Sequence, residues 1–136
     1  MIVSKTLFMG TANDNLPRVR PMRPFLDKDQ NIWLISYANA EKIKEIQNNK
    51  QVELCTVSDK HDVLRIQGSL LMEEELSDAE VALVRKQIFE NVPNLGDFFA
   101  GADDVNMVVC KLQIKNIIFR PMETAKKNEL NFPPVD

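Results

Sequence analysis

The chain has few of the residues on which many kinds of protein chemistry depend. Its 136 residues include two cysteines, one histidine, one tryptophan and four glycines. A zinc site or a cysteine–histidine catalytic pair would have to use the single histidine, His61, for which we expect no role. Cys55 and Cys110 lie in separate apolar stretches and form no Cys-x-x-Cys motif. We therefore expect two buried free thiols, in a reducing compartment, and no metal site.

Long apolar runs, excess positive charge and the common nucleotide-binding motifs are absent as well. No run is long enough to span a bilayer and residues 1–5 do not resemble an export signal, so we expect a cytoplasmic protein with no membrane partner. A net charge of −3 argues against nucleic acid as the main partner. Neither GxGxxG, GxxxxGKS/T nor GxSxG occurs, so Rossmann, P-loop and α/β-hydrolase chemistry lack support.

The sequence does contain many short apolar segments separated by turn residues. A chain of this length, with 44% hydrophobic residues, is expected to form one domain with a substantial core. We predict seven short strands, at residues 5–12, 18–25, 32–37, 52–57, 63–71, 107–114 and 116–120. Short strands at even spacing favour a small closed barrel, with helices outside it, over a parallel α/β sheet.

Two helical segments interrupt the strands. Residues 40–49 would form a short, mostly polar helix with Asn39 as its N-cap. Ser77 and Glu80 make a capping box that opens a second helix, and a short helical turn follows at 95–100. The apolar face of the second helix carries Val81, Val84 and Ile88.

Some residues between these elements have a structural and a chemical interpretation. Gly68 indicates a bulge or bend in its strand, and the acidic run 73–75 is typical of a solvated surface turn. Asp103 and Asp104 could bind a metal, but without further placed ligands a loop pair is favoured. No residue stands out as a general base, so an enzyme with this sequence would rely on a cofactor that the protein positions.

The segment 16–24 combines cations and prolines on a strand. Arg18, Arg20 and Met22 alternate onto one face. The three prolines of this segment cannot donate to a ladder, so the strand suits the edge of a sheet. Two interpretations remain open: an edge guarded against aggregation with solvated arginines, or an edge whose free backbone groups meet a flat heteroaromatic ring.

The next apolar run leads into the first turn of the short helix, where Lys42 and Lys44 occur. The helix dipole disfavours cations there, so their presence makes sense if an anion is bound at the helix start. Ser36 could add a hydroxyl, and an arginine of the preceding strand a guanidinium. Glu41 and Glu45 partly offset the lysines, which leaves a solvated helix face as the alternative. Together the two segments favour a phosphate site.

Taken in order, these segments resemble a known family. A first strand is followed by Pro-Arg-Val-Arg-Pro-Met at 17–22, an apolar strand with Ser36, Asn-Ala-Glu-Lys at 39–42, a helix, and Val-Glu-Leu-Cys at 52–55. This order is similar to that of the pyridoxamine 5′-phosphate oxidase-like flavoproteins, and the likeness covers residues 5–120. It implies a mainly β fold, a six- to seven-stranded antiparallel split β-barrel with peripheral helices.

The resemblance also implies a homodimer that holds FMN in two clefts at the subunit interface. The cofactor-binding residues would be Arg18, Val19, Arg20, Pro21, Met22, Arg23, Ser36, Tyr37, Asn39 and Lys42. The arginine strand would run beside the isoalloxazine, and Arg18, Ser36 and Lys42 would bind the phosphate. In this chain Glu41 replaces a basic residue that many relatives carry, and Asp62 stands where the vitamin-processing oxidases have a glutamine.

The C-terminal segment differs from that of the vitamin-processing oxidases, whose tryptophan- and arginine-rich end helps to hold the pyridoxal substrate. Residues 121–136 contain neither residue, and we expect them to be a polar tail or strap after a single FMN-binding domain at 1–120. The chain therefore resembles the compact general-stress and flavin-reductase-type members, and not a true pyridoxamine phosphate oxidase.

The function that this resemblance implies is an FMN-dependent oxidoreductase. It would pass electrons from a reduced nicotinamide to a small acceptor such as a quinone, a nitroaromatic or oxygen, with no catalytic side chain identified. A non-catalytic flavin store or redox sensor is the alternative, and the same fold also hosts haem or a deazaflavin. Residues 95–107 are the part of the partner subunit expected to complete the cleft.

Overall fold

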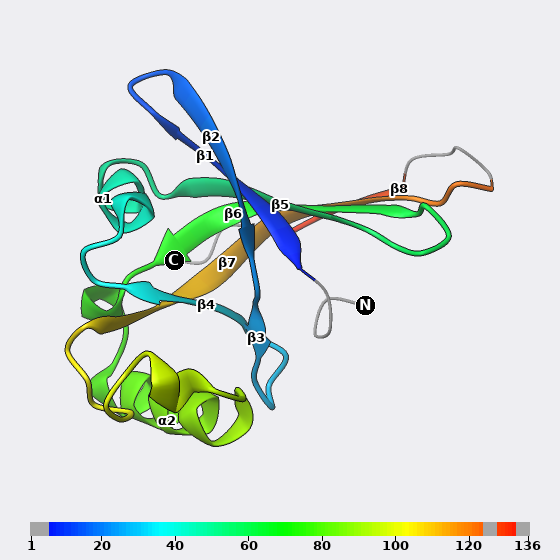
Figure 1. Ribbon diagram of the computed structural model, residues 1–136. Coiled ribbons are helices and arrows are strands. Elements are labelled where there is room, and N and C mark those ends of the chain that lie inside the picture. Colours follow the sequence, from blue (N-terminus) through cyan, green and yellow to red (C-terminus); the bar gives the residue numbers. More distant parts are fainter. Residues whose placement is uncertain (1–5, 124–127, 133–136) are drawn as a thin grey trace.

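The strands form one antiparallel sheet that curls back on itself (Figure 1). The computed structural model describes residues 6–123 and 128–132. The strands are β1 (Leu7–Asn13), β2 (Leu16–Met22), β3 (Phe25–Leu26), β4 (Ile32–Tyr37), β5 (Gln51–Val57), β6 (Val63–Leu71), β7 (Met107–Arg120) and β8 (Asn128–Asn131). Their order along the sheet is β2-β1-β5-β6-β7-β4-β3, and β8, which the sequence does not predict, pairs with β7.

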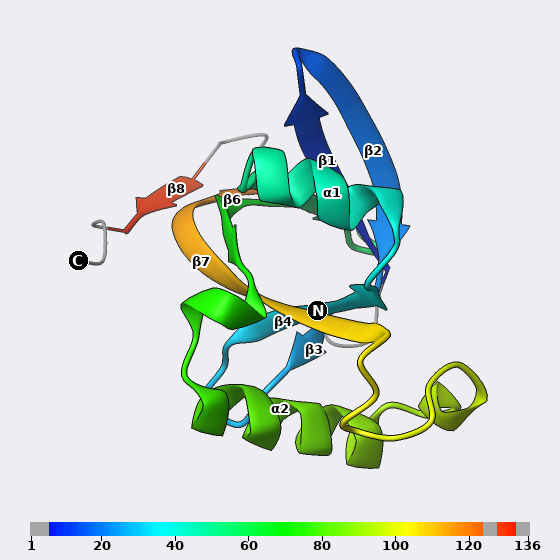
Figure 2. The ribbon, with the colours of Figure 1, turned by 90° about the vertical axis from the view of Figure 1, so that its left-hand side faces the viewer.

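Helices lie on the periphery of the sheet. They are α1 (Glu41–Asn48), the 3-10 turn η1 (Glu73–Glu75), α2 (Asp78–Asn91) and the 3-10 turn η2 (Leu95–Asp97). Figure 2 shows α1 above the curled sheet and α2 below β3 and β4. A mainly β split barrel with peripheral helices is thus confirmed. Within the described residues, no helix is both long and apolar enough to cross a membrane.

β4 separates two hydrophobic clusters, because its alternate side chains face opposite sides. Leu34 belongs to the cluster inside the curl of the sheet, with residues of β1, β5, β6 and α1. Trp33, on the other face, packs with Val84 and Ile88 of α2. The uninterrupted apolar run at 32–37 predicts burial on both faces, and this is confirmed.

β7 is one continuous strand, where the sequence predicts two strands separated at Lys115. Lys115 is the extra residue of a bulge opposite Gln67 and Gly68, so the ladder absorbs it without a turn. The irregularity predicted at Gly68 is confirmed. A Cβ on Gly68 would lie 2.3 Å from the carbonyl oxygen of Gln113, so the close approach of the two strands requires glycine.

The barrel is open, although the strand pattern alone favours a closed one. The sheet ends at β2 on one side and at β3 on the other, which confirms the proline-rich strand as an edge. The predicted strand 18–25 is divided, because Pro24 cannot continue the β1 ladder and the chain instead turns to pair Phe25 with Trp33 of β4. A split remains between the two ends of the sheet.

The two helix starts differ in how well the sequence predicts them. Ser77 caps α2 as predicted, since its Oγ accepts the backbone N–H of Glu80 at 3.2 Å. The N-cap of α1 is Ala40, with no side-chain cap, so the prediction of Asn39 is wrong. The amide of Ala40 donates to the carbonyl of Tyr37 at 3.1 Å, and this tight turn after β4 contains Asn39.

Candidate functional site

A cavity of about 770 Å³ lies in the split of the sheet. Its walls come from the end of β2 and the link to β3, the second half of β4, the first turn of α1, and the segment from α2 through η2. The volume falls in the range of small-molecule sites, about 300–1,000 Å³. Both ends of the sheet therefore face one candidate binding space.

The structure brings six of the ten sequence-predicted site residues to this cavity: Pro21, Met22, Arg23, Ser36, Tyr37 and Lys42. The other four do not line it. Val19 is 71% exposed on the outer face of β2, and Asn39 is exposed in the turn before α1. Arg18 and Arg20 instead contact a carboxylate on α1.

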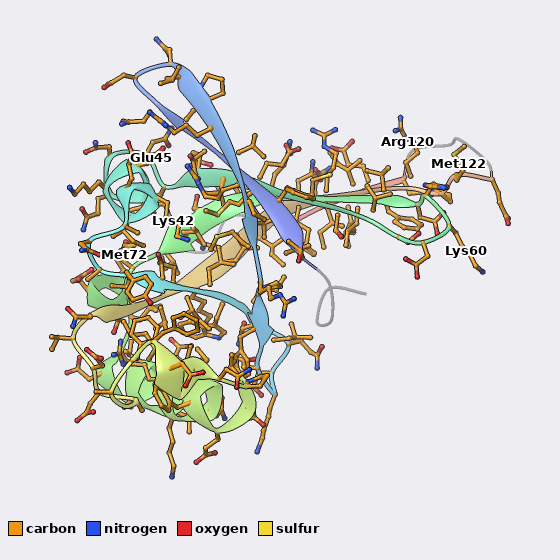
Figure 3. All side chains as sticks on the ribbon, in the orientation of Figure 1. Lys42, Glu45, Lys60, Met72, Arg120 and Met122 are labelled. Atoms are coloured by element: carbon orange, nitrogen blue, oxygen red, sulfur yellow. The ribbon has the colours of Figure 1, made fainter. Side chains whose placement is uncertain are left out.

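That carboxylate belongs to Glu45, which is buried beneath the β1–β2 hairpin (Figure 3). Arg20 Nη2 lies 2.9 Å from Glu45 Oε1, and Arg18 Nε lies 3.5 Å from Oε2. Arg20 also donates to Thr11 Oγ1 at 2.9 Å, and Arg18 lies 3.8 Å from Glu41. These contacts tie α1 to the hairpin and so fix the border of the cavity.

Ser36 and Lys42 are the polar residues at the α1 side of the cavity. Ser36 is 8% exposed, and its buried Oγ has no hydrogen-bond partner among the described residues. Lys42 Nζ contacts Sδ of Met22 at 3.4 Å and forms no ion pair within the described chain. Burial lowers the pKa of Lys42, and the charge of Arg20 lowers it further. An unpartnered hydroxyl and a desolvated ammonium fit an anionic group that accepts hydrogen bonds.

The first turn of α1 adds to this electrostatic field. The N–H of Ile43 donates to the carbonyl of Ala40 at 3.1 Å, whereas the N–H groups of the two residues before it have no partner within the helix, and the dipole places partial positive charge there. Lys42 is the second residue of the helix, and its neighbour Glu41 has a side chain that is 75% exposed to solvent and does not line the cavity. The helix start therefore presents positive charge to the cavity, as expected for an anion site.

Sequence reasoning missed the wall supplied by α2 and the segment after it. Its residues are Gln87, Asn91, Val92, Pro93, Leu95, Phe98 and Phe99. The rings of Tyr37 and Phe99 lie 4.9 Å apart with an interplanar angle of 41°, and Phe98 is 61% exposed. The adjacent aromatic residues Phe98 and Phe99, after Pro93, were the feature of the sequence that could have indicated this wall. Part of the segment 95–107, expected to reach a partner's cleft, thus lines the cavity of its own chain.

A buried arginine holds this wall in place. Arg85 of α2 is 8% exposed and lies 3.1 Å from both carboxylate oxygens of Glu73. It also donates, over 2.5–2.8 Å, to the main-chain oxygens of Ala102, Asp104 and Met107. The acidic run 73–75 is therefore more than the solvated turn predicted, because Glu73 neutralises a cation that the helix buries.

The other candidates from the sequence do not line the cavity. His61 is exposed in the β5–β6 turn at a positive φ of 65°. Both cysteines are free; Cys55 is only partly buried, and burial raises the pKa of the Cys110 thiol to about 12. Asp104 accepts the N–H groups of Ala100 and Asn106 at 2.8 and 2.9 Å. Within the described residues, no three potential metal ligands gather.

Comparison with known families gives a match over most of the chain. Residues 3–120 match the family described as pyridoxamine 5′-phosphate oxidase. Among the curated proteins, no sequence matches this chain.

Solved structures share the fold at low sequence identity. A NimC/NimA family protein from Clostridium acetobutylicum has a TM-score of 0.77 at 18% identity, over 93% of this chain and 83% of that one. General Stress Protein 26 from Bacillus anthracis has a TM-score of 0.73 at 19% identity, over 96% and 93%. A pyridoxamine 5′-phosphate oxidase-related, FMN-binding protein from Nostoc punctiforme has 0.69 at 13%, over 98% and 90%. At such identities these likenesses show the fold alone.

Proposed function

The chain belongs to the pyridoxamine 5′-phosphate oxidase family, and on that premise we propose that its cavity binds FMN. The observation that carries the proposal is that the buried, unpartnered Oγ of Ser36 and the partly desolvated ammonium of Lys42 belong to residues that line the same cavity. These two groups would bind the phosphate at the start of α1. The name of the Nostoc punctiforme relative, an FMN-binding protein, supports the same cofactor.

The proposed activity is that of an oxidoreductase. Bound FMN would supply two-electron chemistry, taking a hydride from a reduced nicotinamide and passing electrons to a quinone, a nitroaromatic or oxygen. The chain's own residues would bind and shield the cofactor. Lys42 and Ser36 would neutralise and orient the phosphate, while Tyr37 and the aromatic wall would pack against the ring system and exclude water.

We do not assign pyridoxamine phosphate oxidation to this chain. Residues 121–136 contain no tryptophan and no arginine with which to hold a pyridoxal substrate. The described part of this segment includes β8, whose residues are exposed on the edge of β7. We therefore propose a flavin-reductase-type activity for a domain at 1–120.

The cofactor proposal is tested by mixing the purified protein with excess FMN, removing free flavin by gel filtration and recording the visible spectrum. We expect the structured flavin band to remain with the protein and to be absent from a Ser36→Ala, Lys42→Gln double variant. A wild-type protein that retains no flavin would contradict the proposal. Retained flavin without oxidation of NADH or NADPH by any acceptor would favour the store or sensor.

We further propose that the functional unit is a homodimer. Phe8, Val19 and Val57 are 51%, 71% and 49% exposed. The pairing of β1 with β2 and β5 places these three apolar side chains on one face of the sheet. Contiguous exposed apolar side chains mark interaction surfaces, so a second copy is proposed to cover this face.

A further inference from the structure

A methionine sulfur lies beside the ammonium that we assign to the phosphate of FMN. Nζ of Lys42 donates to Sδ of Met22 at 3.4 Å, and both residues line the cavity. An ammonium is a strong donor, whereas a thioether is a weak acceptor. In the unliganded protein, the charged donor of the cavity is therefore paired with an acceptor whose strength depends on the oxidation state of its sulfur.

Met22 differs from the other methionines that the structure describes, because it alone among them lines the cavity. Met9 and Met107 are 0% and 1% exposed in the core, and Met122 is 62% exposed on the surface. Met72 is 6% exposed, as Met22 is, but it does not line the cavity. Met22 and Met72 therefore match in burial and differ in access from the cavity.

A small oxidant can reach Met22 through the cavity. Hydrogen peroxide is little larger than water, and it is formed when oxygen accepts the electrons of a reduced flavin. The sulfur gives an electron pair to one peroxide oxygen, the O–O bond breaks, and the other oxygen leaves as water with both protons. The thioether is oxidised to the sulfoxide and the peroxide is reduced to water, so this step needs no further reactant.

The sulfoxide changes the surroundings of the ammonium. It converts an apolar side chain into a polar one, and its oxygen is bound directly to the atom that Lys42 contacts. An oxygen is a stronger acceptor than the thioether sulfur, so the ammonium would turn towards the oxidised side chain. A phosphate at the start of α1 would then compete for a donor that is already engaged.

We propose that Met22 is a sulfoxidation site, and that its oxidation by hydrogen peroxide weakens the binding of FMN. This inference rests on the proposed FMN site, because that site assigns Lys42 to the phosphate. Bound FMN would in turn shield the sulfur, so the free protein would be oxidised and the loaded protein protected. A flavoprotein that reduces oxygen would thereby lose its capacity to take up cofactor as peroxide accumulates.

The first test follows the oxidation of individual methionines by mass spectrometry of peptides from peroxide-treated protein. In the free protein we expect Met22 to be oxidised faster than Met72, its partner in burial. Retained FMN should slow the oxidation of Met22 but not that of Met72 or of the exposed Met122. Equal rates at Met22 and Met72, or a rate at Met22 that retained FMN leaves unchanged, would overturn the proposal.

The second test compares the affinity for FMN before and after peroxide treatment. We expect oxidation to weaken wild-type affinity about tenfold, the scale of one charge-assisted hydrogen bond. Met22→Leu should have the same affinity before and after treatment, whatever its starting value. Met72→Leu is the matched control and should lose affinity as the wild-type protein does. A loss that persists in Met22→Leu would place the effect elsewhere, for example at Cys55, and would reject this role for Met22.

Failure of the flavin site would be seen separately. If the untreated wild-type protein does not bind FMN, the relative rates at Met22 and Met72 in the free protein still test the modification site. Faster oxidation of Met22 would support it, and equal rates would reject it. If the untreated and the oxidised protein bind FMN equally well, the flavin site stands and its control by Met22 is rejected. Near-unchanged circular dichroism after treatment shows that the fold is intact.

Discussion

At the scale of single residues, Lys42 decides whether the cavity can bind a phosphate. It lines the cavity, is partly desolvated and forms no ion pair with a described residue. Lys42→Gln removes the charge, and we expect FMN affinity to fall about 10- to 100-fold, because hydrogen bonds to charged groups contribute about 1.5–3 kcal/mol. Lys44→Gln is the control, since Lys44 is exposed and does not line the cavity. Quenching of FMN fluorescence measures the FMN affinity of both variants. If Lys42→Gln binds FMN as tightly as Lys44→Gln, Lys42 is not part of the site.

The same lysine makes binding depend on pH. Burial and the charge of Arg20 lower the pKa of Lys42 from 10.5. The protonated form binds the phosphate dianion, so FMN affinity should be full between the second pKa of the phosphate, about 6, and the pKa of Lys42, and should fall as the pH rises through the latter. Lys42→Arg should keep its affinity to higher pH, because a guanidinium stays protonated. FMN titrations across the alkaline range compare the two proteins, and coinciding profiles would contradict this assignment.

Without FMN, the lowered pKa of Lys42 gives the stability of the fold a pH dependence opposite to that of FMN binding. Since the folded-state pKa of Lys42 lies below the unfolded-state value, the unfolded chain binds more protons between the two. The contribution of Lys42 to the free energy of unfolding therefore rises with pH over that window, while FMN binding weakens. Comparing thermal unfolding with and without FMN across this range separates the two effects.

Glu45 and Arg18 test whether the arginine cluster is structural. Glu45→Gln would leave Arg20 without its carboxylate, and we expect the free energy of unfolding to fall by about 2–3 kcal/mol. This is less than the roughly 3–5 kcal/mol lost when a fully buried pair is broken, because the side chain of Arg20 is 18% exposed. Arg18→Gln should cost about 1 kcal/mol or less, because its side chain is 43% exposed. Urea unfolding measures both. FMN affinity of Arg18→Gln should stay unchanged, and a fall would show that Arg18 reaches the phosphate as the family resemblance implied.

At the scale of elements, the sequence predicts those segments whose signals are local. The apolar run 32–37 and the capping serine Ser77 each identify their element without knowledge of the partners. The continuity of β7 through Lys115 is different, because only the ladder with β6 shows that this residue is bulged and not a turn. Strand continuity depends on the partner, which a single segment does not reveal.

At the scale of elements, the prediction concerns Gly68, at the bulge between β6 and β7. Gly68→Ala would place a methyl group 2.3 Å from the carbonyl oxygen of Gln113, so β6 and β7 would have to separate. We expect the free energy of unfolding to fall by about 1–3 kcal/mol, as for other substitutions that overpack a buried position. Gly96→Ala is the control, since nothing lies within 4 Å of the added carbon. Thermal unfolding of both variants measures the difference, and an equally stable Gly68→Ala would show that the strands adapt.

At the scale of the whole molecule, the cavity exists because the two ends of the sheet do not pair. The six predicted residues that line it come from segments 21–23 and 36–42, which adjacent motifs made predictable. The wall from α2 and η2 comes from more than 40 positions later in the chain, and only the packing of α2 on Trp33 brings it there. The role of Arg85 could not be predicted either, because its partners are mainly backbone carbonyls.

The proposed homodimer provides the last prediction. We expect the wild-type protein to elute as a dimer in size-exclusion chromatography with light scattering. A Phe8→Glu, Val57→Glu double variant should be monomeric, because two carboxylates would have to be desolvated in each copy of the interface. Both side chains are about half exposed, so the charges stay hydrated in the monomer and the fold should persist. Leu83→Glu is the control, since Leu83 is 58% exposed on α2.

The flavin content of the monomeric variant then separates two views of the site. If partner residues complete the cleft, as the family resemblance implies, the monomer should lose FMN even though Ser36 and Lys42 are unchanged. If it binds FMN with wild-type affinity, the wall that Leu95 and Phe99 provide within one chain is sufficient. A wild-type protein that is itself monomeric would contradict the dimer, and the exposed face of Phe8 and Val57 would then require a different partner.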